Sequence, residues 1–574
     1  MVARSAARPL NLLHPAVRAW FSSSFGLQTA PQSLGWPAIA RGDSTLILSP
    51  TGSGKTLAAF LWAINQVMFA PRPAADRRCR VLYVSPLKAL AVYVERNLRS
   101  PIAGVALAAQ SRGDQFVLPE VSVRTGDTPV SERARFRRDA ADILITTPES
   151  LYLLLTSRSR EVLRFVQTVI VDEIHSLVPT KRGVHLMLSL ERLQALCPHR
   201  VQRIGLSATQ RPLDEVARFL GGVERRAGNT QPADEPAGSR MSGADAVHDE
   251  FNAGGRAITY RPVTIIDARQ RKQLALTVEV PVEDLARLAK QVAIQSGPAS
   301  RGTVATSIWS RIHHRLLELI RAHRTTLLFV NSRRLAERLA GAINELAGET
   351  VARAHHGSLS REQRLDIEDA LKAGRIPALV ATSSLELGID MGAIDLVIQI
   401  EAPPSVASGM QRIGRASHQV NAVSNGIVFP KFRGDLVACA AVTRAMHEGL
   451  VEATRYPRNP LDVLAQQVVA MVAMEPWTVD GLYDAVRGAA PFAGLSRPIF
   501  EGVLDMLSGR YPSDEFADLR PRLTWDRIGW MLTARHGAGL VAIINGGTIP
   551  DRGLYWVFLS GAANGAARVG ELDE

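Results

Sequence analysis

Cysteine is scarce in this chain of 574 residues, which contains only Cys79, Cys197 and Cys439. These cysteines stand far apart, so they offer neither a disulfide framework nor a zinc site built from cysteine pairs. Long apolar runs are lacking too: the best one, residues 57–70, contains polar amides and is too short to span a bilayer. Small disulfide-rich proteins and membrane-spanning proteins are therefore excluded. We expect the cysteines to pack in the cores of a protein from a reducing compartment.

Acidic residues are outnumbered by basic ones. The chain has 55 Asp and Glu against 67 Lys and Arg, a formal net charge of +12. This surplus suits a polyanionic partner such as a nucleic acid, although a solvated basic surface on a long chain would give it as well. With 46% hydrophobic and 21% charged residues the composition is globular. The length predicts several domains, each with its own core.

One stretch, Ser49–Thr56 with the sequence SPTGSGKT, carries the strongest signal for a ligand. It follows the β-like run Thr45–Leu48 and opens the helical run Leu57–Trp62. A strand, a glycine-rich loop, Gly-Lys-Thr and a helix, in that order, are the context of a phosphate-binding P-loop. Ser49 stands where the full motif has glycine, which is a common variation. The stretch predicts a nucleotide site.

Each residue type in this loop has a physical task. Glycines let backbone N–H groups point at phosphate oxygens, Lys55 can reach the β- and γ-phosphates, and the Thr56 hydroxyl can ligate Mg²⁺. Upstream, the amide of Gln32 can hold an adenine edge, because it donates and accepts at once. We predict contacts to ATP from Gln32, Thr51, Gly52, Ser53, Gly54, Lys55 and Thr56.

Strand-like and helix-like runs alternate after the loop. Such alternation predicts a parallel sheet covered on both faces, with ligands at the carboxyl ends of its strands. We expect these strands at Val81–Ser85, Val121–Thr125, Asp142–Thr146, Val166–Asp172 and Val201–Ser207. A second alternation begins at Thr325, with strands at residues 326–330, 351–355, 378–381, 396–400 and 426–429. The second half has no P-loop and cannot hold a triphosphate alone.

Two adjacent acids, Asp172 and Glu173, follow the apolar run Val169–Val171. Carboxylates emerging from a buried strand are costly unless a cation or a reaction uses them. We therefore expect Asp172 to hold Mg²⁺, through water, and Glu173 to orient or deprotonate the attacking water. An arginine from the second half that reached the γ-phosphate would make hydrolysis depend on closure between domains.

Past Thr443 the strand alternation stops. Helical runs at residues 458–467, 479–486 and 498–508, followed by β-like runs at 540–544 and 554–559, indicate a winged-helix module. We expect poor order after Leu559. The predicted division is 1–220 for the first domain, 221–257 for a flexible insertion, 258–324 for a connecting segment, 325–443 for the second domain and 444–560 for the winged helix. For residues 561–574, the family resemblance described next implies the start of a truncated β-rich domain.

The ordered motifs resemble superfamily 2 helicases with two RecA-like domains. Four stretches are similar to the bacterial large helicase-related family: Tyr83–Ala91, His355–Ser360, Arg458–Gln467 and Asp505–Phe516. The resemblance implies an α/β fold of two tandem RecA-like P-loop-type parallel-sheet domains followed by a mainly helical winged-helix module. It also implies an ATP- and Mg²⁺-dependent DNA helicase of the bacterial cytoplasm and nucleoid. Such an enzyme tracks 3′ to 5′ on single-stranded DNA, separates DNA or RNA:DNA duplexes, and has a role in DNA repair.

The resemblance also implies roles for residues. The catalytic set is Glu173, Gln411, Arg415 and His418, with Arg415 as the arginine finger. Gly388 and Asp390 reach the γ-phosphate and the ribose, and Ser207 and Thr209 couple the ATP site to the strand groove. The track for DNA phosphates is Lys88, Thr147, Ser150, Asn331, Arg333, His356, Ser358 and Thr382.

Two departures from the family pattern keep alternatives open. Ser417 replaces a glycine of the motif that contains Arg415, and a serine there would add strain if that position needs positive φ. Tyr93 stands where the family has an acid. One alternative is an RNA-directed remodeller, since the two halves hold mainly phosphates and sugars. The other is a protein that binds ATP and nucleic acid with little turnover.

Overall fold

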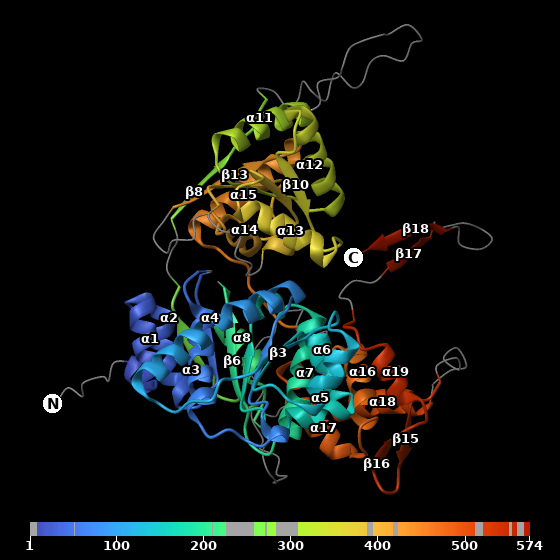
Figure 1. The fold of residues 1–574 in the computed structure, drawn as a ribbon. Helices are drawn as coiled ribbons and strands as arrows, with labels where there is room; N and C mark the ends of the chain where they lie inside the picture. The colour runs from blue at the N-terminus through green and yellow to red at the C-terminus, as the bar shows by residue number, and fades with distance from the viewer. Residues whose placement is uncertain are drawn as a thin grey trace, which may run out of the picture.

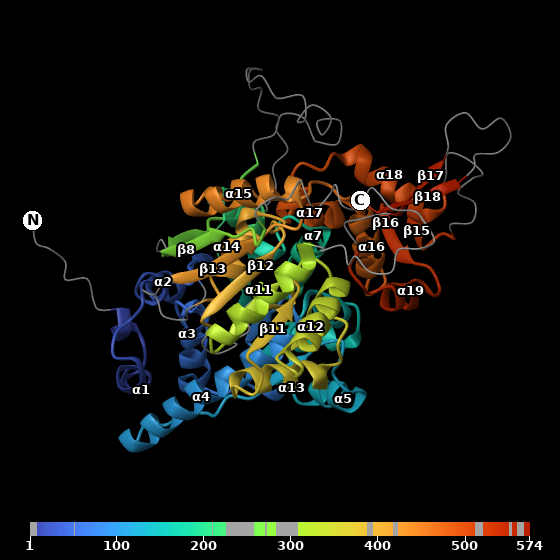
Figure 2. The same cartoon turned by 90° about the horizontal axis from the view of Figure 1, so that it is seen from above.

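The computed structural model describes residues 9–50, 52–208, 210–224, 258–269, 273–282, 308–386, 394–416, 423–510, 520–549, 554–558 and 568–573. Within these ranges the chain forms two α/β domains, each around a parallel sheet, and a helical module packed on the first of them (Figures 1 and 2). None of the described helices is long and apolar enough to cross a bilayer. All three cysteines are buried, as expected.

The first domain is built on a parallel sheet with the strand order β3-β4-β2-β5-β6-β1-β7. The strands are β1 (Thr45–Leu48), β2 (Val81–Val84), β3 (Val121–Arg124), β4 (Ile143–Thr146), β5 (Thr168–Val171), β6 (Gln202–Ser207) and β7 (Thr264–Asp267). Because β5, β6 and β1 are neighbours, their carboxyl ends bring the P-loop, the acidic pair and Ser207 to one edge. The expected positions of the first five strands after the P-loop are confirmed.

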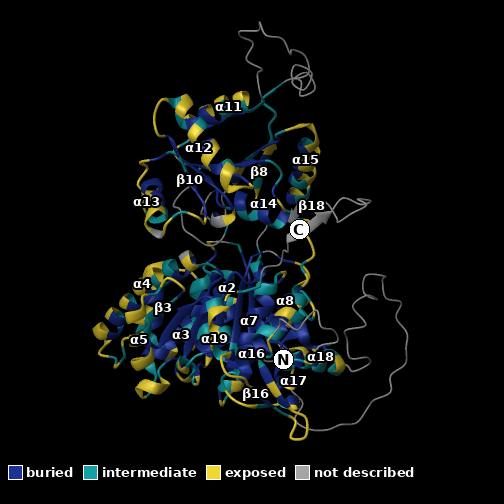
Figure 3. Cartoon of the chain, turned by 90° about the vertical axis from the view of Figure 1, so that its right-hand side faces the viewer, coloured by how far each residue is buried: buried dark blue, intermediate teal, exposed yellow. Residues whose placement is uncertain are grey.

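Helices cover both faces of this sheet, and the strands between them consist largely of buried residues (Figure 3). Two clusters of buried apolar side chains fill the interfaces between the sheet and its helices. The α-helices are α1 (Pro15–Phe25), α2 (Ala30–Ala40), α3 (Lys55–Phe69), α4 (Lys88–Arg112), α5 (Val130–Arg138), α6 (Pro148–Leu155), α7 (Lys181–Leu196) and α8 (Leu213–Gly221). Short 3₁₀ turns lie at Pro9–Leu12, Ala75–Arg77, Arg158–Leu163 and Ile174–Ser176.

The second domain has a parallel sheet with the order β10-β11-β9-β12-β13-β8. Its strands are β8 (Leu274–Val278), β9 (Thr326–Phe329), β10 (Ala352–His355), β11 (Ala378–Ala381), β12 (Leu396–Ile400) and β13 (Ser424–Phe429). Its helices are α11 (Ile308–Ala322), α12 (Arg333–Ala347), α13 (Arg361–Lys372), α14 (Val406–Ile413) and α15 (Arg433–Glu448), with a 3₁₀ turn at Ser383–Leu385. Two apolar clusters fill this domain and include no residue of the first domain.

The expected connecting segment 258–324 contributes an edge strand to each sheet. Strand β7 pairs in parallel with β1, with Thr264 opposite Thr45, and β8 pairs with β13, with Leu274 opposite Ser424. The boundary between the two sheets therefore falls between Asp267 and Leu274. Apolar periodicity identifies a strand but does not say which sheet it joins.

The third module contains α16 (Leu461–Val472), α17 (Val479–Arg487), α18 (Arg497–Ser508) and α19 (Ala538–Ile544). A small antiparallel sheet, β14-β16-β15, joins them, with β14 at Trp477–Thr478, β15 at Leu523–Asp526 and β16 at Met531–Ala534. A 3₁₀ turn lies at Ala490–Phe492. The expected strand at 540–544 is wrong: this run belongs to α19. Ala538 and Ala542, one helical turn apart, form its buried face.

A further antiparallel pair lies near the end of the chain. Strand β17 (Leu554–Phe558) pairs with β18 (Arg568–Asp573), with Leu554 opposite Asp573. The expectation that residues after Leu559 lack order is wrong for Arg568–Asp573. Backbone pairing with β17 satisfies N–H and C=O groups that would otherwise be left on a bare edge.

The winged-helix module shares one hydrophobic core with the first domain. Side chains of α16, α17, α18 and α19 belong to the same buried cluster as β1, β2, β4, β5 and α7. At the centre of this interface Gln467 of α16 is fully buried: its amide donates to the carbonyl of His185 and to Ser189 Oγ, both at 3.1 Å. Its Oε1 accepts a hydrogen bond of 2.9 Å from Arg192. The polar group is thus fully satisfied, and the two parts form one packed body.

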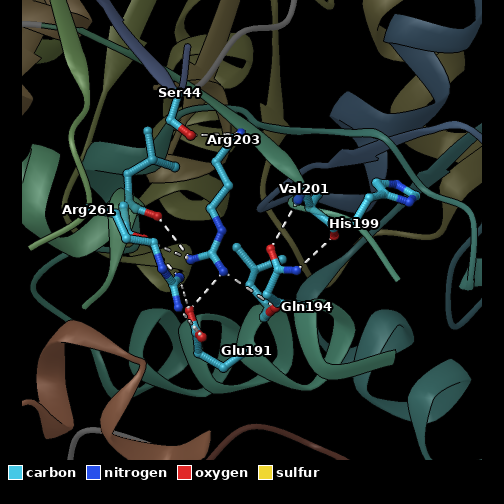
Figure 4. A network of polar contacts seen from close by, with 10 residues as sticks. Ser44, Glu191, Gln194, His199, Val201, Arg203 and Arg261 are labelled. Atoms are coloured by element: carbon cyan, nitrogen blue, oxygen red, sulfur yellow. Dashed lines mark hydrogen bonds and ion pairs between the residues drawn. The ribbon is translucent and has the colours of Figure 1, made fainter. Parts of the chain in front are cut away.

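A buried ion network lies where the first domain meets the winged helix (Figure 4). Glu191 lies on α7, and its Oε1 accepts a hydrogen bond of 2.7 Å from Arg203 Nη2. Both of its carboxylate oxygens accept hydrogen bonds from Arg261, at 2.6 and 2.8 Å. A Cβ added to Gly488 of the winged helix would lie 2.5 Å from Glu191 Oε2. Burial would raise the pKa of Glu191, but the two guanidinium groups outweigh burial and lower it to about 2. The carboxylate is therefore ionised at neutral pH.

Candidate nucleotide site between the two domains

The P-loop turns sharply at two glycines. Gly52 and Gly54 both have a φ of 80°, and α3 begins directly after Gly54. The Ser53 hydroxyl lies 2.7 Å from both Ser49 Oγ and the Pro50 carbonyl, which closes the loop on itself. A Cβ on Gly54 would lie 2.7 Å from Gln32 Nε2. The positive φ at position 54 therefore favours glycine, and the absence of a Cβ leaves room for the Gln32 amide, the predicted adenine-reading group.

Lys55 faces the acidic pair. Its Nζ lies 3.3 Å from Glu173 Oε2, and both side chains are buried. Burial would raise the pKa of Glu173, but the charge of Lys55, with a smaller contribution from Arg415, outweighs burial and lowers the pKa. Glu173 has a φ of 44°, in the left-handed region, where a non-glycine residue is strained. This backbone turns the Glu173 carboxylate toward the P-loop lysine.

Asp172 is held by a residue to which the sequence analysis gave no role. The hydroxyl of Tyr83, on the neighbouring strand β2, donates a hydrogen bond to Asp172 Oδ2. Burial and the charge of Glu173 raise the pKa of Asp172 to about 6, against the opposing effect of Lys55. The pairing of β2 with β5, which puts Tyr83 opposite Ile170, could not be read from the sequence.

His175 links the acidic pair to the loop after β6. The backbone N–H of Ala208 donates to His175 Nδ1 at 3.2 Å, and this nitrogen lies 3.4 Å from Glu173 Oε2. Burial lowers the pKa of His175 to about 4, although Glu173 and the side chain of Gln411 oppose this effect. His175 is therefore neutral near pH 7. The carbonyl of Ser207, a predicted coupling residue, accepts a hydrogen bond of 3.2 Å from the Ser49 N–H of the P-loop.

The second domain completes the site from the opposite side. Gln411 on α14 lies beside His175, and Arg415 lies close enough to lower the pKa of Glu173. Arg415 Nη2 donates to the carbonyl of Glu386 at 2.6 Å. The structure thus brings Lys55, Asp172, Glu173, Gln411 and Arg415 together.

Glu386 organises α14, and sequence reasoning missed it. Its carboxylate accepts hydrogen bonds from Ser408 Oγ at 3.1 Å and from Arg412 Nε at 2.7 Å. Arg412 also donates to Asn331 Oδ1 at 3.0 Å and to Gln399 Oε1 at 2.9 Å. Asn331, predicted to contact DNA, is therefore hydrogen-bonded to Arg412, a buried arginine of α14. Glu386 lies in the run Thr382–Asp390, TSSLELGID, which also contains the predicted site residues Gly388 and Asp390, and this proximity in sequence was the available signal.

Other residues predicted to follow the DNA strand fall into separate groups. Arg333 Nη1 donates to Ser358 Oγ at 2.7 Å, and His356 Nε2 lies 2.7 Å from Glu337. In the first domain, Thr147 caps α6 through Ser150, and both are buried. Thr382 donates its N–H to the carbonyl of His355 at 3.3 Å. The predicted site residues Thr51, Thr209, Gly388, Asp390 and His418 lie outside the described residues.

Lys88 lines a cavity of about 360 Å³ between the two domains. The first domain contributes Lys88 and Arg96 to it, and the second contributes Arg364 and Lys372. Lys88 is paired with Asp127, with Nζ 2.7 Å from Oδ1. Acids also line the cavity, so its charge is mixed: Glu95, Glu132, Glu368 and Asp369.

Three family models match the chain in the order of its domains. Residues 29–216 match the DEAD/DEAH box helicase model, 311–418 the helicase conserved C-terminal domain, and 444–574 the winged helix domain of the large helicase-related protein. A Mycolicibacterium smegmatis protein named Lhr helicase/probable uracil glycosylase is 47% identical over 99% of this chain and 36% of its own length. The Escherichia coli Lhr helicase/uracil glycosylase is 46% identical over 98% and 37%.

A solved structure of a related protein has the same fold. The structure of Mycobacterium smegmatis helicase Lhr bound to ssDNA and AMP-PNP superposes with a TM-score of 0.80 and 47% identity, over 97% of this chain and 65% of that one. The chain spans just over a third of the length of the Mycolicibacterium smegmatis and Escherichia coli relatives named above. The motifs, the two parallel-sheet domains, the winged helix and these likenesses lead to one conclusion: the chain belongs to the large helicase-related (Lhr) family of ATP-dependent helicases.

Proposed function

We propose that this chain hydrolyses ATP to move 3′ to 5′ along single-stranded DNA and to separate DNA or RNA:DNA duplexes, as part of DNA repair. The observation that carries the ATPase proposal is the position of Lys55, directly after the P-loop glycines, with its Nζ 3.3 Å from the Glu173 carboxylate. The charge of Arg415, from the second domain, contributes to the lowered pKa of Glu173. A site shared by two domains makes hydrolysis depend on their closure and release. The direction, the hybrid substrate and the repair role are supported by the family resemblance.

Each residue then has a task in hydrolysis. Lys55 binds the β- and γ-phosphates, and it moves from the Glu173 carboxylate toward them when ATP arrives. Glu173, ionised at neutral pH, orients the attacking water and accepts its proton. Arg415 stabilises the negative charge that develops on the γ-phosphate oxygens.

The site also fits a magnesium ion. The buried carboxyl of Asp172 is held by a neutral tyrosine rather than by a dedicated cation, and Thr56 opens α3 next to Lys55. Thr56 and Asp172 would hold Mg²⁺, which would neutralise charge on the phosphates when bound.

Steady-state ATP hydrolysis, measured alone, with single-stranded DNA and with single-stranded RNA of the same sequence, tests the proposal. We expect stimulation by DNA. A Lys55→Ala preparation, purified in parallel, reports any contaminating ATPase. Stimulation by RNA alone would favour an RNA remodeller, and ATP binding without turnover would favour a protein that only binds.

Salt dependence tests the strand track. We expect Lys88→Ala to weaken binding to all DNA sequences alike and to reduce the slope of log K against log salt by about 1, because one phosphate contact is lost. Asp127→Asn is the matched control: it frees Lys88 from its ion pair and should tighten binding. Fluorescence anisotropy with labelled oligonucleotides of contrasting sequence measures both. Loss confined to one sequence would indicate base readout instead.

A further inference from the structure

The segment Glu452–Tyr456, which we call the strap, connects the second domain to the winged helix. It follows α15 and precedes α16, and it contacts both halves of the nucleotide site. The Glu452 carboxylate accepts hydrogen bonds from the first two backbone N–H groups of α14: Val406 at 2.5 Å and Ala407 at 3.2 Å. An anionic side chain at a helix N-terminus also interacts favourably with the helix dipole. Glu452 therefore holds the start of α14 together with the N-cap Ser405, whose hydroxyl accepts a hydrogen bond of 3.0 Å from the Ser408 N–H.

The contact between Glu452 and α14 matters because this helix positions two predicted catalytic residues. Gln411 lies on the helix, and Arg415 follows two residues after its last residue, Ile413. Arg415 is held there by the carbonyl of Glu386, to which its Nη2 donates at 2.6 Å. An eight-residue helix held at its first turn by Glu452 and near its end by Glu386 has a defined axis. The position of the Arg415 guanidinium follows from that axis.

The other end of the strap is attached to the first domain. Ala453 forms a parallel bridge with Arg211, and the Thr454 N–H donates to the Arg211 carbonyl at 2.6 Å. The Thr454 hydroxyl donates to the side-chain carbonyl of Gln210, which is buried. Gln210 and Arg211 follow the predicted coupling residues Ser207 and Thr209. The strap thus connects the loop after β6 to the N-terminus of α14.

We propose that Glu452 is a positioning residue, which sets the arginine side of the ATP site relative to the first domain through α14. This inference rests on the proposed ATPase function. Glu452 is exposed, so replacing its charge should leave the fold intact. The loss should instead appear in the rate of hydrolysis, because small misplacements of a catalytic group are costly in rate.

The test compares Glu452→Gln with Glu448→Gln. The control removes a carboxylate four residues earlier, which pairs only with the exposed Arg444 in the described contacts. We expect Glu452→Gln to lower kcat per nucleotide-binding site about tenfold, with KM for ATP changed less than about twofold, because the P-loop is untouched. Glu448→Gln should match the wild type.

A double-mutant cycle decides whether the effect passes through α14. In an Arg415→Ala background, Glu452→Gln should cause no further loss. An unchanged kcat in the single variant, or an equal loss in both backgrounds, would overturn the inference.

Hydrogen exchange of the peptide spanning 403–414 gives a readout independent of turnover. We expect faster exchange in Glu452→Gln than in Glu448→Gln, and equal exchange would overturn the inference even if ATPase is absent. A wild-type chain without ATPase activity, but with this difference in exchange, would refute the proposed function alone.

Discussion

Replacing Glu173 with glutamine should lower kcat for ATP hydrolysis about 10³-fold while leaving ATP and single-stranded DNA binding within about twofold. Glutamine has nearly the same shape and keeps an oxygen toward Lys55, but it cannot accept the proton of the attacking water. Removal of a general base costs roughly 10²- to 10⁴-fold. Single-turnover hydrolysis, with separate nucleotide and DNA binding titrations, measures each effect. A loss of ATP affinity equal to the loss of rate would instead assign Glu173 a binding role.

The control for this variant is Glu120→Gln. Glu120 lies just before β3, at the amino end of the strands, and pairs with Arg78 and Arg135 near the surface. The nucleotide site lies at the carboxyl ends of the same sheet, so this substitution removes a carboxylate from the same domain without touching the chemistry. We expect its kcat to match the wild type. A comparable loss in Glu120→Gln would point to a general effect of charge on the domain.

Glu191→Gln should destabilise the folded chain by about 3–5 kcal/mol, because it leaves Arg203 and Arg261 without a full counter-charge in a buried site. Urea unfolding, followed by tryptophan fluorescence, measures the free energy of unfolding. Glu161→Gln, an exposed glutamate paired with Arg160, should show no measurable change. A stability equal to the wild type would mean that the two arginines are neutralised by other groups.

The pH dependence gives Glu191 an independent signature. Its pKa is lowered to about 2 in the folded chain and is near 4.3 when unfolded, so ionisation stabilises the fold above the unfolded value. This contribution, about 3 kcal/mol, is lost as the pH falls from about 4.3 toward 2. We expect Glu191→Gln to lack that part of the acid dependence. An unchanged acid profile in the variant would contradict the assignment.

Sequence reasoning located the parts of the nucleotide site that depend on local order. The P-loop, the acidic pair and the strands that carry them follow from periodicity and from residue types adjacent along the chain. Tyr83, Glu386 and Glu452 were given no role because each acts on a residue distant in sequence. Only the observed strand order and the packing of α14 bring these pairs together.

In the winged helix, too, contacts between residues distant in sequence could not be predicted from local patterns. The run Leu540–Ile544 is rich in β-branched residues and predicts a strand, yet packing of Ala538 and Ala542 makes it a helix. The observed hairpin consists of β15 and β16. Buried and exposed residues alternate only over the four residues Leu523–Asp526, and this run is too short to predict a strand from the sequence. Tertiary contacts decided both cases. The roles of the residues predicted to contact DNA stay predictions.

The core shared by the first domain and the winged helix has a consequence for synthesis on the ribosome. The second domain is, in topological terms, an insertion between two halves of one folding unit. At a synthesis rate of about 5–20 residues per second, α16 follows β7 by roughly 200 residues, or about 10–40 s. During that interval the face of α7 that carries His185, Ser189 and Arg192 lacks its hydrogen bonds to Gln467 of α16. The first domain therefore cannot complete its core on the ribosome until α16–α19 have been synthesised.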